Sequence, residues 1–227
     1  MRAILKKELK SYFLSPIGYV VIGIFLLSFS IFFYQGVFSG GSVDLGYLYY
    51  GSALYGLMIV APILTMRMFA EERKNGTEQL ILTAPVGICK IVMGKLLAAL
   101  LVIVVTVLIS FMYWAIVSFF GKINIISSLV AILGFILMSI SALSIGMFAS
   151  SITENQIIAG IITIAFLIIS LFLGNINVIF SSFTLIEFYL PFAQGVISLE
   201  SGISLILFAC LFIALTIIVL KRRKLVR

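Results

Sequence analysis

The stretch RMFAEERKNGTEQLILTAPVGICKIVMGK, residues 67–95, interrupts a chain that is otherwise almost entirely apolar. Runs without any charged residue flank it on both sides, at residues 46–66 and 96–121. A helix of about 20 apolar residues is long enough to cross the hydrocarbon core of a bilayer. The stretch is therefore expected to join two membrane-spanning helices and to hold its charges outside the membrane. Those charged residues are Arg67, Glu71, Glu72, Arg73, Lys74, Glu78, Lys90 and Lys95.

The composition of the whole chain is that of an integral membrane protein. Of its 227 residues, 63% are hydrophobic and 10% are charged, whereas soluble domains average about 25% charged residues. Further charge-free runs occupy residues 11–43, 123–153, 155–186 and 201–220. We therefore expect an all-α membrane protein with a single transmembrane domain over residues 1–227. Its six membrane-spanning helices are expected at 17–37, 47–66, 91–119, 125–150, 156–176 and 202–220.

The basic residues predict the orientation of the chain. With six spans, both termini and the 67–95 stretch fall on one side of the membrane, and that side holds every lysine and arginine except Lys122. Cytoplasmic segments carry an excess of Lys and Arg, so both termini are expected in the cytoplasm. The net charge of +7 is thus explained by membrane orientation, and no nucleic-acid partner is expected.

Residues 1–15 have the pattern of a helix lying in the headgroup plane of the bilayer. Lys6, Lys7 and Lys10 fall on one helical face, and Ser15-Pro16 breaks the helix before the first span. A simpler alternative is that these lysines only set the topology. The apolar face of this expected interfacial helix consists of Leu5, Leu9, Tyr12 and Phe13.

Two further segments are expected to be neither spans nor plain loops. Residues 70–83 combine good helix formers with charges, and Ala84-Pro85 ends the pattern, which predicts an amphipathic cytoplasmic helix. The alternative is a solvated connector whose charges only keep it out of lipid. Residues 178–200 interleave aromatic and polar side chains, which predicts short re-entrant helices that dip into the outer leaflet.

The sequence lacks the residues that several kinds of chemistry require. It has no histidine and no cluster of Cys, Asp or Glu at metal-ligand spacing, so no cofactor is expected in this chain. A P-loop reads G-x-x-x-x-G-K-[ST], whereas Gly94-Lys95 has Cys89 in the first glycine position and is followed by Leu96. Energy from ATP would therefore have to come from another protein.

The stretch after the second expected span resembles the corresponding segment of ABC-2 type permeases, the membrane subunits of ATP-binding-cassette exporters. The shared pattern is a charged cluster followed by Gly-Thr, a leucine-rich helix, a proline and a later Gly-Lys. Here it runs from Glu71 to Pro85 and then to Gly94-Lys95. The sequence FAQGVI at residues 192–197 resembles the family's stretch before the last span. The nearest subgroup is the short permeases of the gliding-motility (Gld) and nitrous-oxide-reductase-maturation (Nos) type.

The resemblance implies a type-2 ABC exporter fold in the bacterial cytoplasmic membrane. It implies a permease that couples ATP hydrolysis by two copies of a partner ATPase, which bind Mg-ATP, to substrate export or force transmission. A second permease copy or paralogue would complete the complex. The resemblance also allows for an additional auxiliary membrane subunit. Residues 70–83 would form the coupling helix that docks on the ATPase. The residues so implied in coupling are Glu71, Glu72, Arg73, Gly76, Thr77, Leu80, Leu82 and Pro85.

Two other classes of protein stay open. One is an ATP-independent six-span channel or secondary carrier, in which the 67–95 stretch would be regulatory. The expected spans are almost free of ionisable side chains, which argues against ion-coupled transport. The other is a membrane-embedded enzyme. The absence of histidine from the chain and of paired carboxylates from the expected spans argues against it.

Overall fold

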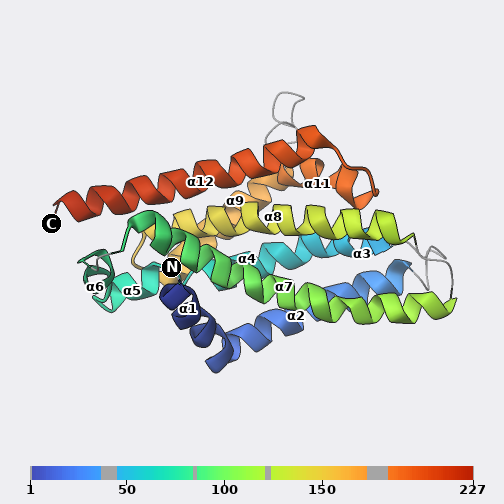
Figure 1. Cartoon of the computed structure of the whole chain (residues 1–227), viewed down its shortest axis with the longest axis horizontal. Helices are drawn as coiled ribbons and strands as arrows, with labels where there is room; N and C mark the ends of the chain where they lie inside the picture. The colour runs from blue at the N-terminus through green and yellow to red at the C-terminus, as the bar shows by residue number, and fades with distance from the viewer. Residues whose placement is uncertain (1, 37–44, 84–85, 121–123, 173–183, 227) are drawn as a thin grey trace.

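The chain folds as a bundle of long apolar helices running roughly side by side (Figure 1). The structure is a computed structural model, and it describes residues 2–36, 45–83, 86–120, 124–172 and 184–226. Its helices are α1 (Arg2–Leu14), α2 (Pro16–Tyr34), α3 (Leu45–Gly51), the π-helix η2 (Ser52–Gly56), α4 (Leu57–Thr65), α5 (Ala70–Lys74), α6 (Glu78–Thr83), α7 (Ile88–Phe120), α8 (Ile125–Ile152), α9 (Gln156–Phe172), α11 (Leu185–Ala193) and α12 (Leu199–Val226).

Five helical stretches in the described part of the chain are long and apolar enough to cross a membrane. They are α2, the stretch Leu45–Lys74 that runs through α3, η2, α4 and α5, and the helices α7, α8 and α12. They correspond to five of the six expected spans. The other expected span, 156–176, coincides with α9, which is apolar but only 17 residues long where it is described. Residues 173–176 lie outside the described part, so a sixth span stays a prediction.

The second expected span differs most from an ideal helix. A π-helical turn at Ser52–Gly56 separates α3 from α4, and Pro62 lies inside α4. Such wide turns are rare and are frequently found at functional sites. Gly56 sits against Ser28 and Phe25 of α2, so closely that an added Cβ would lie 2.9 Å from the Ser28 hydroxyl. Glycine therefore lets α2 approach this turn.

Helix α8 is the central helix of the bundle and contacts α3, α4, α7, α9, α11 and α12. Small residues allow these close approaches, as is common between membrane helices. A Cβ on Gly146 would overlap the side chain of Thr65, and one on Gly134 would overlap Phe192. Ser141 also donates a hydrogen bond to the Leu205 carbonyl of α12, at 2.8 Å.

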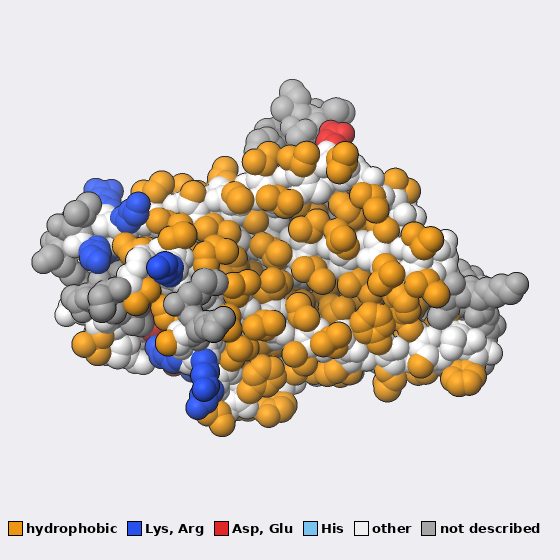
Figure 2. All heavy atoms as spheres, in the orientation of Figure 1, with side chains coloured by type: hydrophobic (Ala, Val, Ile, Leu, Met, Phe, Trp, Pro, Cys, Tyr) orange, Lys and Arg blue, Asp and Glu red, His pale blue; other side chains and the backbone are white. Residues whose placement is uncertain are grey.

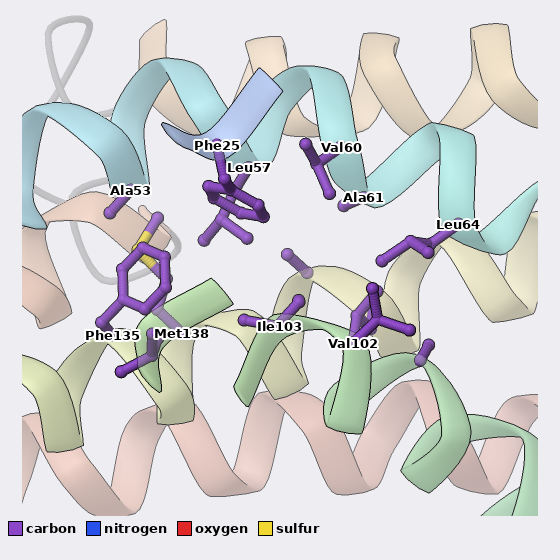
Figure 3. Packing of buried hydrophobic residues seen from close by; sticks show 14 of the residues in the cluster. Phe25, Ala53, Leu57, Val60, Ala61, Leu64, Val102, Ile103, Phe135 and Met138 are labelled. Carbon is purple, nitrogen blue, oxygen red and sulfur yellow. The ribbon is translucent and has the colours of Figure 1, made fainter. Parts of the chain in front are cut away.

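The buried apolar core lies where α2, α4, α7 and α8 meet (Figure 3). Phe25 of α2 contacts Phe29 in a stacked arrangement and Phe135 of α8 edge to face. Such aromatic pairs contribute about 0.5–1.5 kcal/mol beyond the area that they bury. This core joins helices that are distant in sequence. Its labelled members in Figure 3 are Phe25, Ala53, Leu57, Val60, Ala61, Leu64, Val102, Ile103, Phe135 and Met138.

Short helix α11 lies within the region expected to be re-entrant and packs against α8, α3 and α12. It ends in a Schellman motif, in which the Gly195 N–H donates to Phe192 and the Val196 N–H to Pro191. Gly195 has φ +77° there, a conformation that favours glycine. Residues 173–183 are outside the described part, and the entry of this region into the outer leaflet stays a prediction.

The two ends of the bundle differ in charge. Figure 2 shows a hydrophobic flank along the long helices and lysine and arginine side chains gathered at one end. Both termini, α5 and α6 lie toward that end (Figure 1). We call it the basic end. Residues of α1, α5, α6, the start of α7 and the last turns of α12 form it.

Candidate functional site

At the basic end, the helix is interrupted between α4 and α5. Helix α4 ends at Thr65 and α5 begins at Ala70, so residues 66–69 form a non-helical joint. A helix end leaves backbone groups without intrahelical partners. Other elements supply those partners here. The Tyr12 hydroxyl of α1, which is buried, donates to the Leu64 carbonyl at 3.0 Å.

Ser150 of α8 satisfies the other side of the joint. Its Oγ accepts hydrogen bonds from the backbone N–H groups of Phe69 and Ala70, both at 3.1 Å, and donates to the Met66 carbonyl at 3.2 Å. The hydroxyl thus acts as an N-cap for α5 although it is 80 residues away from Ala70 in sequence. It attaches the joint to the central helix of the bundle.

Lys95 of α7 is the buried centre of a charge cluster. Its side chain is 2% exposed, and its Nζ lies 2.9 Å from Glu8 Oε1 and 2.8 Å from Glu72 Oε1. It also donates to the Met68 carbonyl at 2.7 Å and lies 5.2 Å above the Phe69 ring. The ammonium donates hydrogen bonds to Glu8 and to the Met68 carbonyl, and it forms an ion pair with Glu72. A buried lysine needs such pairing, because an unpaired charge there would be very costly.

Arg67 and Glu71 form a second ion pair beside Lys95. Arg67 Nε and Nη2 lie 2.6 and 2.7 Å from the two oxygens of Glu71, a bidentate geometry. The hydrogen bonds from Arg67 hold the pKa of the Glu71 carboxyl below its usual value and raise the pKa of the guanidinium. Lys7 of α1 lies 3.2 Å from Glu72 Oε1. We call these six residues the inner cluster: Lys7, Glu8, Arg67, Glu71, Glu72 and Lys95.

The inner cluster surrounds an open polar pocket of about 200 Å³. Its walls come from α1, the joint, α5 and the start of α7, and Asn75 and Thr77 also line it. The cluster holds three cationic and three anionic side chains, so its charges balance. Burial raises the pKa of Tyr12 nearby, and the negative charge of Glu8 adds to this effect.

A separate cluster, which we call the outer cluster, lies at the end of α8. Arg73 Nη2 is 2.8 Å from Glu154 Oε1, and Arg223 Nη1 of α12 is 3.3 Å from Glu78 Oε1. Both arginines also donate to the Ile152 carbonyl, at 3.1 and 3.2 Å. Cationic groups stabilise a helix C-terminus, where carbonyls are unpaired. The outer cluster therefore attaches α5 and α6 to α8 and α12.

The segment expected as one helix over 70–83 is two short helices. Gly76 has φ +71°, and its N–H donates to the Arg73 carbonyl, so α5 ends in a glycine turn. The Thr77 hydroxyl donates to the Glu72 carbonyl at 3.2 Å. The single continuous helix was therefore wrong, because the left-handed glycine breaks it. Gly76 and Thr77 do precede the start of a helix, α6.

The residues implied in coupling lie in three different settings. Glu71, Glu72 and Arg73 contact partners within the chain, so their side chains face the bundle. Leu80 is 73% exposed, and Lys74, Asn75, Gly76, Thr77 and Gln79 are exposed as well. Leu82 lies in α6, and Pro85 is outside the described residues. We call residues 74–80 the tip. Glu78 is the exception within it, since it is 5% exposed and belongs to the outer cluster.

The four residues of the expected apolar face of α1 also differ in how far they are buried. Tyr12 is buried, while Leu5, Leu9 and Phe13 are half-buried, and Leu9 and Phe13 pack against the core. Helix α1 packs on α7 and α2. One side of it thus contacts protein. Its position in the headgroup plane stays a prediction.

The partners of several site residues were not predicted. Lys95, Glu8, Ser150, Glu154 and Arg223 come from different parts of the fold, and Lys95 lies 87 positions from Glu8. A lone lysine at the start of an apolar run was a usable signal, because ionisable groups near a span are costly and need a partner. The identity of that partner was not available from the local sequence.

The fold and the basic end together define a class: a multi-pass α-helical membrane protein with a jointed polar segment between its second and third spanning helices. The model of a protein family described as ABC-2 family transporter protein matches residues 38–221. The chain therefore belongs to the ABC-2 family of transporter proteins, and it is a membrane transport component. No curated protein matches it.

Proposed function

We propose that the chain is the membrane-spanning subunit of an ATP-binding-cassette exporter, driven by a separate ATPase that docks on the tip. The family supports transport, and family members normally work with such an ATPase. The observation that supports docking is the asymmetry of α5 and α6. Ion pairs hold their inner side on the bundle, while Lys74, Thr77 and Leu80 are exposed at the basic end.

The chemistry of the tip fits a protein partner better than lipid. Lys74, Asn75, Thr77 and Gln79 offer polar groups, and Leu80 adds one exposed apolar side chain among them. Central apolar contacts with a polar rim are typical of protein interfaces. This assignment moves the ATPase contact from the charged residues 71–73 to residues 74–80.

The remaining parts of the proposal follow from this docking. The basic end lies in the cytoplasm of a bacterium, where ATP is available, and both termini lie there too. Two ATPase copies bind Mg-ATP, and a second permease completes the complex. Closure of the ATPases moves the tip, and the spans respond by exporting a substrate or by transmitting force.

Purification of the tagged full-length chain in mild detergent from its native membrane tests this proposal. We expect the wild-type eluate to contain a stoichiometric ATPase and to hydrolyse ATP. Reversing the charge and polarity of the tip in Lys74→Glu/Leu80→Glu should abolish that association. Lys90→Glu is the matched control, since Lys90 is exposed at the same end but outside the tip.

Each other outcome has a definite meaning. A wild-type chain that purifies alone, stable and without ATPase activity, contradicts the exporter proposal and favours a channel or carrier. Equal ATPase recovery with the tip variant and with the control would place the docking site elsewhere on the chain.

A further inference from the structure

Lys95 takes no part in the proposed docking at the tip, so the proposed function does not explain its buried contacts. It is nearly fully buried, and its three oxygen partners lie on three segments: Glu8 on α1, Met68 in the joint and Glu72 on α5. In the part of the chain that the structure describes, every polar contact from α7 to the joint or to α5 comes from Lys95. One ammonium therefore connects three elements.

The backbone gives a reason why this connection matters. The joint at 66–69 is a hydrogen-bonded turn in which the Met68 N–H donates to the Thr65 carbonyl, so α5 does not continue α4 as one α-helix. Helix α7, by contrast, runs without interruption from Ile88 to Phe120. Lys95 of α7 contacts α5 directly through Glu72, and it contacts the joint through the Met68 carbonyl. Ser150 and the outer cluster connect α5 only to α8 and α12.

The charges make Lys95 hard to replace. Glu8 and Glu72 each have an oxygen within 3 Å of the same nitrogen, and both side chains are about nine-tenths buried. Without the ammonium, two carboxylates would face each other on the wall of the pocket, and like charges at that range repel. Lys7 binds Glu72 at 3.2 Å but is largely exposed, and it belongs to α1, not to α7. It cannot restore the connection to the third span.

We propose that Lys95 is the positioning residue that makes α1, α5 and α7 move as one body, so that displacement of the tip reaches the third span. This inference rests on the proposed function, because the displacement comes from the docked ATPase. It adds to the proposed function the residue that transmits the displacement and the path that the displacement takes. The displacement passes from the tip to α5, from Glu72 of α5 to Lys95, and from Lys95 to α7 and to Glu8 of α1.

The test measures movement of α7 in the assembled complex. Spin labels are placed at Lys90→Cys on α7 and Lys221→Cys on α12, both exposed positions, in a Cys89→Ser/Cys210→Ser background. The labelled chain is diluted with unlabelled chain, so that each complex holds one label pair. The distance is compared between the nucleotide-free and the ADP-vanadate states. We expect a shift in the otherwise wild-type chain and its loss in Lys95→Met, with ATPase binding retained.

Two further variants separate positioning from a folding defect. Lys95→Met/Glu8→Gln/Glu72→Gln removes the repelling charges together with the lysine, and we expect it to be stable but still without the shift. Lys224→Met removes an exposed lysine of α12 and should keep the full shift. Lys95→Arg, which keeps the charge, should restore part of it.

The outcomes distinguish this inference from the proposed function. If the ATPase binds and the shift persists in Lys95→Met or returns in the triple variant, the role of Lys95 is overturned while the exporter stands. A bound ATPase with no shift in the parent chain overturns it as well. If no ATPase binds the wild-type chain, the proposed function fails, and this inference fails with it.

Discussion

Single side chains decide how the joint at 66–69 is held. Backbone groups released at a helix end must find other partners when they are buried. Tyr12, Lys95 and Ser150 supply those partners from three helices. The joint therefore needs no regular secondary structure of its own, and its geometry depends on residues far away in the chain.

The first prediction for a single side chain concerns the Ser150 hydroxyl. Ser150→Ala would leave the N–H groups of Phe69 and Ala70 without their acceptor in a buried place. An unsatisfied buried polar group costs about 1–3 kcal/mol, so we expect a clear fall in the Tm of the detergent-purified protein. Ser118→Ala is the control, because the Ser118 hydroxyl is exposed and only bonds back to the Ala115 carbonyl. Equal Tm values for the two variants would contradict the capping role.

Among the elements, α5 and α6 have only five and six residues, so neither is long enough to be stable alone. Isolated helices below about 12 residues are marginal in water. The inner cluster and the outer cluster hold them on opposite sides, one toward α1 and α7 and the other toward α8 and α12. These attachments explain how so short a segment keeps a defined shape.

A prediction about the short helices concerns the glycine turn between α5 and α6. Gly76 has φ +71°, and a Cβ added to it would meet no described atom within 4 Å beyond its chain neighbours, so only the backbone opposes a side chain there. Gly76→Ala should cost about 1–2 kcal/mol in the left-handed conformation and should weaken ATPase recovery by displacing α6. Gly76→Asn should be milder, since asparagine tolerates this conformation.

Gly23 supplies the matched control for this turn. It lies within α2, also with open space around it, but its φ is not positive. Gly23→Ala should therefore keep or slightly raise Tm, because alanine is the better helix former. Full ATPase recovery with Gly76→Ala would show that the angle between α5 and α6 does not matter for docking.

At the scale of the whole molecule, charge and apolar surface are separated. The flank of the bundle is hydrophobic, whereas lysine and arginine side chains gather at the end that holds both termini (Figures 1 and 2). A bilayer covers such a flank and leaves the charged end in water. The whole arrangement predicts that the tip and both termini share one aqueous compartment.

The two native cysteines test that orientation. Cys89 lies exposed at the basic end, whereas Cys210 lies within the apolar helix α12. A membrane-impermeant maleimide should label Cys89 in inside-out vesicles and not in right-side-out vesicles. The Cys89→Ser variant should lose the labelling in inside-out vesicles and stay unlabelled in right-side-out vesicles. Labelling of Cys89 only from the outside would reverse the proposed topology.

The local sequence predicted the long helices well, because membrane insertion depends on hydrophobicity within one stretch. The expected spans at 91–119 and 125–150 match α7 and α8 to within a few residues. The prediction was poorer at residues 70–83, where good helix formers concealed the break at Gly76. It was also incomplete at Glu71, Glu72 and Arg73, for which the resemblance implied contacts with the ATPase and for which the structure shows ion pairs within the chain.

The sequence by itself determined that this is a helical membrane protein with one charged end and a polar segment after its second span. Those properties follow from hydrophobic length and from the placement of charge, and both can be read locally. Only the tertiary structure decided which charges meet. The pairing of Lys95 with Glu8 and Glu72, and the capping of α5 by Ser150, depend on helices distant in sequence packing side by side.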